Sequence, residues 1–183
     1  TPQQATGSLL ARKNRDPQSA RLPYDLRFHG EIRQCGKVTS LRCTVYTLTG
    51  GAHGLLTNLF FNFDTESGKP LDKADLFSDT AGLQRLNRQY FAKHLSDAAL
   101  SEDALFVGTD QLPLPENVGI DSSGVTMLYN PYEVAPYAIG TIEYRIPYTN
   151  AGKRGLLTYF YDGCWTPENQ LGAVYPRPSE ESE

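Results

Sequence analysis

Apolar and polar residues alternate along Val38–Leu48, and this spacing of two predicts a β-strand. Leu55–Phe63 is rich in aromatic and apolar residues and predicts a second strand, joined to the first by the glycine-rich turn Gly50–Gly54. Tyr24–Cys35 has a weaker strand pattern and leads into a turn at Gly36-Lys37. On Val38–Leu48, one face would carry Leu41, Cys43, Val45 and Thr47, and the other Arg42, Thr44 and Tyr46.

The pattern becomes helical at Asp72. Asp72 can cap a short helical turn, and Asp79 or Thr80 can cap a longer helix, because a side-chain oxygen there accepts hydrogen bonds from the free amides of the first turn. We expect the longer helix to have roughly 15–18 residues, with apolar side chains at steps of three and four. The residues at these steps are Leu83, Leu86, Tyr90 and His94.

Further strand patterns follow in the second half of the chain. Gly124–Asn130 and Ile142–Tyr148 both alternate apolar and polar residues, which predicts two strands. Leu112–Asp121 is expected to be a proline-rich connection, and Glu102–Val107 either a short helix or a strand. Gly155–Trp165 fits a last strand and a buried helix equally well.

Predicted strands and helices are grouped along the chain rather than strictly alternating. This grouping favours an α+β fold, with a mainly antiparallel sheet and the longer helix packed on it. We expect one domain over residues 22–165, made of a short N-terminal module (22–50) and a main part (51–165). The polar ends, residues 1–21 and 166–183, are expected to be a flexible arm and a tail.

Charge and hydropathy exclude two classes of partner. The chain of 183 residues has a formal net charge of -4 and a pI near 5.4, and its Lys and Arg residues form no run. Proteins that grip nucleic acid without sequence preference need basic patches, so we expect no nucleic-acid partner. No apolar stretch approaches the roughly 18–20 residues of a membrane span. We therefore expect a soluble domain without a transmembrane segment.

Three cysteines, Cys35, Cys43 and Cys164, leave one over in any pairing. Their spacing matches no zinc-binding pattern, so we expect no metal and no cofactor. In an oxidising compartment one disulfide would form, and Cys35–Cys43 or Cys43–Cys164 are the pairings that we favour. The alternative is three buried free thiols that pack as small hydrophobic side chains.

Several motifs together resemble a bacterial domain family of unknown function. Domains similar to this family form the extracellular part of lysozyme-sensing anti-sigma factors, and others are attached to cell-wall polysaccharide deacetylases. The resemblance covers about residues 38–150. Its motifs are YTLTGGAHG (Tyr46–Gly54), FNFD (Phe61–Asp64), GKPL (Gly68–Leu71), DLF (Asp75–Phe77), NPYEVAPYAIG (Asn130–Gly140) and IEYRIPY (Ile142–Tyr148).

This resemblance implies an α+β unit similar to a subdomain of the Hsp70 ATPase, without implying ATP binding. It also implies a location in the bacterial cell envelope, periplasmic or extracellular, after removal of a signal peptide or lipoprotein leader. A lipid anchor would then lie outside this chain. Deacetylation is not implied, because that chemistry belongs to a separate catalytic domain. The chain departs from the family in its short module ahead of the GGAHG turn, about Leu22–Leu48, and in having no transmembrane anchor.

His53 is the first candidate site residue, since glycines on both sides let its turn take conformations that other residues avoid. Its imidazole would either bind a ligand or transfer protons, or else tie the turn to a neighbouring loop. The second candidate is the segment that begins at Asn130, which prolines make rigid. Tyr132, Glu133 and Tyr137 there would offer aromatic faces and a carboxylate, with the Asn130 amide, to a sugar or peptide. Alternatively these side chains only cover the core.

The chain has no nucleophile elbow, HExxH motif, P-loop or dinucleotide-binding fingerprint, so we favour a protein that is not an enzyme. Our first hypothesis is a non-catalytic binding or sensor module of the cell envelope, with a cell-wall peptidoglycan fragment or a lysozyme-like envelope protein as partner. The second is an envelope hydrolase that uses His53 as general base with Glu133 or Asp64. The third is a structural accessory domain that pairs with another chain through an incomplete sheet.

Overall fold

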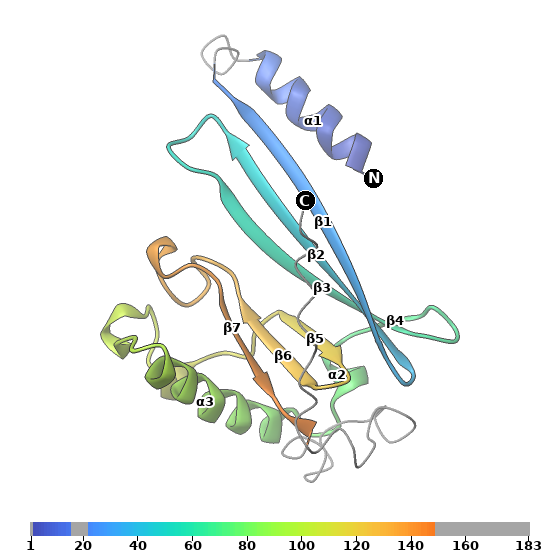
Figure 1. Ribbon diagram of the computed structural model, residues 1–183, viewed down its shortest axis with the longest axis vertical. Helices are drawn as coiled ribbons and strands as arrows, with labels where there is room; N and C mark the ends of the chain where they lie inside the picture. The colour runs from blue at the N-terminus through green and yellow to red at the C-terminus, as the bar shows by residue number, and fades with distance from the viewer. Residues whose placement is uncertain (1, 16–21, 149–183) are drawn as a thin grey trace, which may run out of the picture.

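The computed structural model describes residues 2–15 and 22–148, which form two antiparallel sheets and three α-helices (Figure 1). The larger sheet has the order β1-β2-β3-β4, and the smaller has the order β5-β6-β7. The strands are β1 (Tyr24–Cys35), β2 (Val38–Thr49), β3 (Leu55–Asp64), β4 (Pro70–Leu71), β5 (Asn117–Asp121), β6 (Gly124–Tyr129) and β7 (Ile142–Ile146). The α-helices are α1 (Pro2–Arg15), α2 (Lys73–Leu76) and α3 (Thr80–Asp97), and short 3-10 turns lie at Glu102–Ala104, Thr109–Gln111 and Tyr137–Ile139. The α+β prediction is confirmed, with two sheets in place of one.

The first two strands form one long hairpin around the turn at Gly36-Lys37. Their register runs from Tyr24 opposite Thr49 to Cys35 opposite Val38, so both strands and the turn are as predicted. Gly36 has φ 55°, the positive value that the first residue of a tight hairpin turn requires. β2 then pairs with β3 over almost the same length, which confirms the predicted face of Leu41, Cys43 and Val45.

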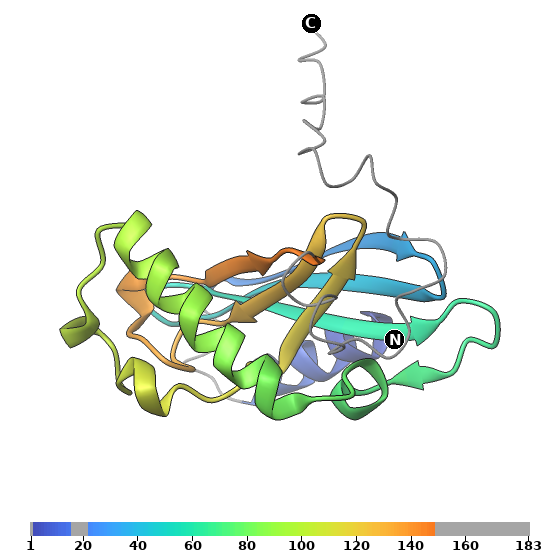
Figure 2. The same ribbon diagram turned by 90° about the horizontal axis from the view of Figure 1, so that it is seen from below.

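The two sheets and α3 form three layers, with the smaller sheet in the middle (Figures 1 and 2). One face of the smaller sheet packs on α3, where the ring of Phe91 lies edge-on to those of Tyr129 and Tyr144. The other face packs on the larger sheet, whose Arg42 forms an ion pair with Glu143. Both β5 and β6 are therefore buried on both faces, and the apolar core lies between α3 and the smaller sheet.

Both predicted helix caps are confirmed. The Asp72 carboxylate accepts a hydrogen bond from the Asp75 amide at 2.9 Å, and the Asp75 carboxylate accepts one from the Asp72 amide at 3.1 Å. The Asp79 carboxylate accepts from the Gly82 amide at 2.7 Å and so caps α3. Each cap satisfies amides that the first helical turn cannot pair internally.

β5 corrects the expectation of a structureless connection across Leu112–Asp121. Residues Asn117–Asp121 pair with β6, and all five are buried. The sequence pattern hides this strand, because Gly119 interrupts its apolar alternation. A Cβ atom at Gly119 would lie 2.3 Å from the ring of Phe60, so the glycine is what lets the two sheets approach each other here.

A polar cluster is enclosed in the core between α3 and the smaller sheet. The Asn87 amide nitrogen donates to the Tyr129 hydroxyl at 2.8 Å and to the Pro113 carbonyl at 3.2 Å. Its amide oxygen accepts from the Tyr144 hydroxyl at 2.6 Å, and the Tyr129 hydroxyl donates to the Pro113 carbonyl at 2.5 Å. Burial raises the pKa of Tyr129 to about 12 and also raises that of Tyr144, so both hydroxyls keep their protons at neutral pH.

The cysteine pairings that we favoured from the sequence are wrong. Cys43 is a free thiol, whereas both favoured disulfides include it. Cys35 is disulfide-bonded, which also excludes three free thiols. Cys43 faces outward on the larger sheet beside Leu41 and Val45, so it has no cysteine within reach on that face among the described residues. Cys164 and the segment Gly155–Trp165 lie outside the described residues.

Helix α1 lies within the segment that we expected to be an N-terminal arm. The Lys13 ammonium lies 5.3 Å from the centre of the Tyr24 ring, which places the end of the helix beside the start of β1 (Figure 1). A cation over an aromatic face is an attractive but weak contact at an exposed site. None of the helices in the described ranges is both long and apolar enough to cross a membrane.

Candidate functional site

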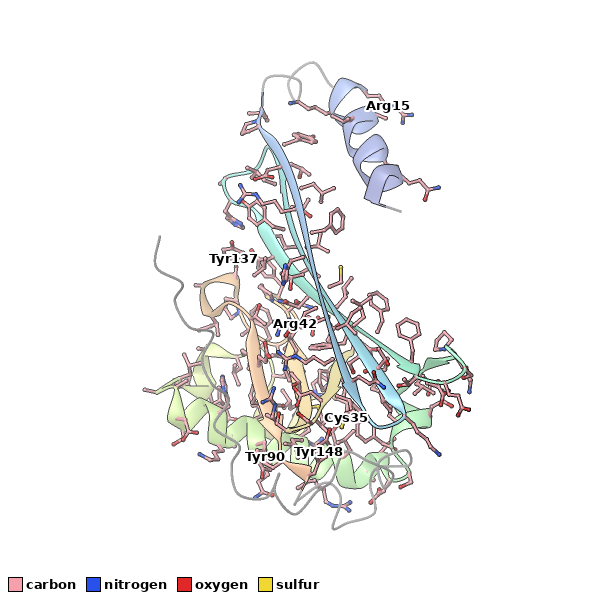
Figure 3. The ribbon with its side chains drawn as sticks, turned by 45° about the vertical axis from the view of Figure 1, so that its right-hand side comes forward. Arg15, Cys35, Arg42, Tyr90, Tyr137 and Tyr148 are labelled. Atoms are coloured by element: carbon pink, nitrogen blue, oxygen red, sulfur yellow. The ribbon has the colours of Figure 1, made fainter. Side chains whose placement is uncertain are left out.

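Two connections meet at one end of the sheets, and together they carry the candidate site residues. The β2–β3 turn, Gly50–Gly54, belongs to the larger sheet, and the β6–β7 connection, Asn130–Thr141, belongs to the smaller one. In Figure 3, Tyr137 projects from the β6–β7 connection toward the β2–β3 hairpin. The fold therefore brings together the two candidate motifs of the sequence, the glycine-rich turn around His53 and the segment that begins at Asn130.

Three aromatic side chains from these connections stack into one row, which we call the ring row: His53, Tyr137 and Tyr132. The His53 and Tyr137 rings lie 4.1 Å apart at 23°, and the Tyr137 and Tyr132 rings 5.8 Å apart at 29°. Tyr137 occupies the middle of the row and is half-buried, whereas His53 is exposed and Tyr132 is 54% exposed. The row therefore has two ends that are accessible to a ligand.

Gly54 holds the histidine side of the row in place. Its carbonyl accepts a hydrogen bond from the Tyr137 hydroxyl at 2.8 Å and lies 3.2 Å from Nδ1 of His53. A Cβ atom at Gly54 would lie 2.3 Å from the ring of Tyr46, so only glycine allows this close approach. The glycines around His53 thus serve packing as well as turn geometry, and Tyr46 is a supporting residue that the sequence did not single out.

Asn130 anchors the β6–β7 connection to the edge of β3. Its amide oxygen accepts from the Asn58 backbone N–H at 2.7 Å, and its amide nitrogen donates to the Asn58 carbonyl at 2.9 Å and to the Glu133 carboxylate at 3.1 Å. Asn130 is buried, so its polar atoms are committed to the backbone. The structure therefore places Asn130 beneath the ring row as a support, with Asn58 as a partner that the sequence did not reveal.

Tyr132 adopts a backbone conformation that is rare for a bulky residue. Its φ is +74°, and its N–H donates to the Ala135 carbonyl at 3.0 Å. A non-glycine residue in this region stores about 1–3 kcal/mol of strain, and such strain clusters at ligand sites. The turn thus holds an aromatic ring at the exposed end of the row where glycine would be more stable.

We expect Tyr132→Gly to leave the protein as stable as the wild type or to raise its free energy of unfolding by about 1 kcal/mol, because glycine relieves the strain at φ +74°. Urea unfolding followed by circular dichroism would measure the change. Tyr132→Ala is the matched control, since it removes the same ring and keeps the strained Cβ. A Tyr132→Gly variant that is less stable than Tyr132→Ala would contradict the assignment of strain.

Both carboxylates of the hydrolase hypothesis accept hydrogen bonds from residues other than His53. Asp64 lies at the opposite end of β3 from the turn that carries His53, and its carboxylate accepts hydrogen bonds from Ser67, which lower the pKa of Asp64. The Glu133 carboxylate accepts from Asn130. Within the described ranges, no hydrogen bond joins His53 to a carboxylate, and no three His, Cys, Asp or Glu side chains are placed to hold a metal ion.

Residues 74–149 match the model of a family described as a protein of unknown function, DUF3298. The matched residues lie within residues 38–150, the range over which the motifs indicated a resemblance. None of the curated protein sequences that were compared with the chain matches it.

Two crystal structures share the fold. One is a DUF3298 family protein from Pseudomonas aeruginosa PAO1, with a TM-score of 0.59 and 22% identity over 76% of this chain and 65% of that one. The other is a DUF3298 family member from Bacteroides fragilis NCTC 9343, with a TM-score of 0.62 and 24% identity over 83% of this chain and 62% of that one. The chain thus spans less than two thirds of the length of each protein.

Proposed function

We propose that this protein is a non-catalytic binding module of the bacterial cell envelope and that the ring row is its ligand surface. The observation that carries the proposal is the row itself, in which rings from two separate connections stack 4.1 Å and 5.8 Å apart and end on an exposed, strained tyrosine. Hydrogen bonds that the Gly54 carbonyl accepts from Tyr137 and the Asn130 side chain accepts from the Asn58 N–H fix both connections. A preformed surface of this kind loses little conformational entropy when it binds.

A cell-wall glycan is the ligand class that we favour. Aromatic faces offer apolar contact to the C–H surface of a sugar ring, and nearby polar groups orient its hydroxyls. Tyr132 supplies an open ring face at one end of the row, and the exposed carboxylate of Glu133 lies next to it in the chain. A sugar stacked on Tyr132 would extend the row by one ring and could donate hydroxyl hydrogen bonds to Glu133.

A lysozyme-like protein is the second candidate ligand. The observation that favours it is the pair Leu55 and Leu56, which directly follow the His53 turn and are 38% and 43% exposed. Leu55 and Leu56 point to opposite faces of β3, and Leu56 shares the face of its β2 partner Tyr46. Leu56 and the ring row would together give a larger apolar surface than one sugar needs, and protein interfaces concentrate aromatic side chains in this way. Binding to a protein would therefore depend on Leu56 as well as on Tyr132.

The disulfide at Cys35 supports the proposed location. Disulfides form and persist in oxidising compartments and are rare in the reducing cytosol, so a bonded cysteine fits a periplasmic or extracellular domain. The hydrolase alternative has less support, because His53 contacts a backbone carbonyl rather than a carboxylate. We therefore treat His53 as a stacking residue of the row.

Calorimetric titration with soluble peptidoglycan fragments and with lysozyme would test the proposal. We expect saturable glycan binding that Tyr132→Ala weakens by about tenfold or more, because loss of one stacking ring removes roughly 1–3 kcal/mol. Phe61→Ala is the matched control, since Phe61 is also an exposed aromatic residue but lies on the outer face of β3. Binding of lysozyme that both Leu56→Ala and Tyr132→Ala weaken would favour the protein ligand, and equal binding by all variants would refute the ring row as the site.

A further inference from the structure

The two edges of the larger sheet differ in whether their outward backbone groups have hydrogen-bond partners. At the β3 edge, Asn130 accepts from the Asn58 N–H at 2.7 Å and Asn117 accepts from the Phe60 N–H at 3.1 Å, and β4 pairs with Asn62 and Phe63. Side-chain amides thus complete the hydrogen bonds of that edge. β1, which extends over Tyr24–Cys35, is the other edge strand. It pairs with β2 on one side, and no described strand pairs with its other side. A long open edge of this kind is a template for pairing with another strand.

The turn at Gly36-Lys37 determines which backbone groups reach the open edge. In a two-residue hairpin, the flanking residues Cys35 and Val38 form a hydrogen-bonded pair, and such pairs recur at every second residue. The odd-numbered residues of β1 therefore bond to β2, and the even-numbered ones direct both N–H and C=O outward. In the described part of the chain nothing bonds to these outward groups, which belong to Tyr24, Leu26, Phe28, Gly30, Ile32 and Gln34.

Charged residues on the inner face of β1 form a pattern that is complementary to itself. In an antiparallel pair of β1 strands with His29 opposite the partner's His29, Arg27 lies opposite the partner's Glu31 and Asp25 lies opposite the partner's Arg33. Two-fold symmetry repeats both pairs, which gives four contacts of opposite charge. Sliding the partner strand by two residues either way places Arg27 opposite the partner's Arg33, or Asp25 opposite the partner's Glu31. Within one chain Arg27 already pairs with Asp25, and Arg33 with Glu31 and Asp121. Of the three registers compared, only the one centred on His29 extends this network without a like-charge contact.

The outward backbone groups and the apolar side chains of β1 fit the same register. It pairs even-numbered residues with even-numbered ones, as the outward hydrogen-bonding groups require. On the outer face, Ile32, which is 71% exposed, lies opposite the partner's Leu26. Phe28, which is 44% exposed, lies opposite the partner's Gly30. Among the described residues, a Cβ atom at Gly30 would have only the Leu41 side chain near it, at 3.9 Å, which leaves room for the Phe28 ring of a second copy. An aromatic ring over a strand glycine is a stabilising cross-strand pair.

We propose that this protein forms a two-fold homodimer by antiparallel pairing of β1 with β1 of a second copy. The two four-stranded sheets then join into one sheet of eight strands, with His29 at the two-fold axis. This proposal concerns the β1 edge, whereas the ring row lies on the connections that follow β2 and β6, and it goes beyond the proposed binding function. The sequence also led to the hypothesis of a domain that pairs with another chain through an incomplete sheet. The present proposal specifies that partner as a second copy of this chain.

Charge reversal tests the register directly, with sedimentation equilibrium of the full chain as the measurement. Arg27→Glu and Glu31→Arg each create two like-charge contacts in the homodimer and should raise its dissociation constant on the order of tenfold to a hundredfold. A mixture of the two variants restores opposite charges at both contacts. We therefore expect the mixed dimer to form within about threefold of the wild-type dissociation constant. A mixture that associates no better than either variant alone would overturn the register.

Disulfide trapping tests the two-fold axis independently. In a Cys43→Ser background, His29→Cys places two thiols on directly opposed residues, about 4.5–5.5 Å apart at Cβ, and should give a covalent dimer under mild oxidation by copper phenanthroline. Arg27→Cys is the matched control, since that residue is on the same face but lies opposite the partner's Glu31. We expect trapping of His29→Cys only. Equal trapping at both positions, or a wild-type protein that stays monomeric at about 1 mM, overturns the dimer and assigns the charges of β1 to protection of the edge.

Discussion

Asn87→Leu is expected to lower the free energy of unfolding by about 3–4 kcal/mol, the largest effect that we predict for one substitution. Asn87 is inaccessible to solvent, and its amide group makes three hydrogen bonds, to the Tyr129 and Tyr144 hydroxyls and to the Pro113 carbonyl. Leucine fills a similar space but removes the 2.6 Å acceptor of the Tyr144 hydroxyl, which keeps only the longer contact of 3.4 Å to the backbone carbonyl of residue 87. A buried unsatisfied polar group costs roughly 1–3 kcal/mol, and several are affected here. Urea unfolding would measure the loss.

A triple variant separates the cost of unsatisfied groups from the cost of altered packing. Adding Tyr129→Phe and Tyr144→Phe to Asn87→Leu removes the two hydroxyls that lose their bonds to the Asn87 side chain, and with them the Tyr129 donor to the Pro113 carbonyl. The triple variant should therefore recover about 1–2 kcal/mol of the loss, although it carries more substitutions. If its unfolding free energy instead falls by the sum of the three single effects, packing rather than hydrogen bonding determines the stability of this cluster.

Asn130→Ala is expected to cost about 2–4 kcal/mol, because it leaves the Asn58 N–H and C=O without partners at a buried strand edge. The same substitution frees the connection that carries Tyr132 and Tyr137, so ligand binding at the ring row should be weakened as well. Equilibrium unfolding and the calorimetric titration together measure both effects.

Glu133→Gln is the matched control for Asn130→Ala, since its amide oxygen can still accept the hydrogen bond from Asn130. We expect its effect on stability to stay within about 0.5 kcal/mol, as is typical of an exposed position. An Asn130→Ala protein that unfolds like Glu133→Gln would show that water satisfies the Asn58 backbone and that Asn130 does not anchor the connection.

Most of the secondary structure is predictable from local patterns. The alternation of β2, the two-residue turn before it and the aspartates at Asp72 and Asp79 are local signals, and each marks an element that the structure contains. β5 is not predictable in this way, because Gly119 and the flanking polar residues break its pattern. Its glycine is explained only by the Phe60 ring, which comes from a strand more than fifty residues earlier. Contacts between sheets leave no local signal.

The candidate site shows the same division between local and distant causes. The glycines beside His53 and the prolines around Tyr132 mark both connections in the sequence, and the structure brings them together as a stacked row. The individual roles were not predictable. Asn130 points to the backbone of β3, which no motif indicates, and Tyr46 explains Gly54 through a contact across the turn. Such roles depend on which residues the other sheet presents.

The ring row is held by a hydrogen bond between residues 83 positions apart, from the Tyr137 hydroxyl to the Gly54 carbonyl. Contacts between residues so distant in the chain form late in folding, since a long loop must close before they are made. Neither sheet alone contains the row, so a partly folded chain has no complete ligand surface. A newly made copy would therefore become able to bind through the row only at a late folding step, and recognition would report that folding is complete.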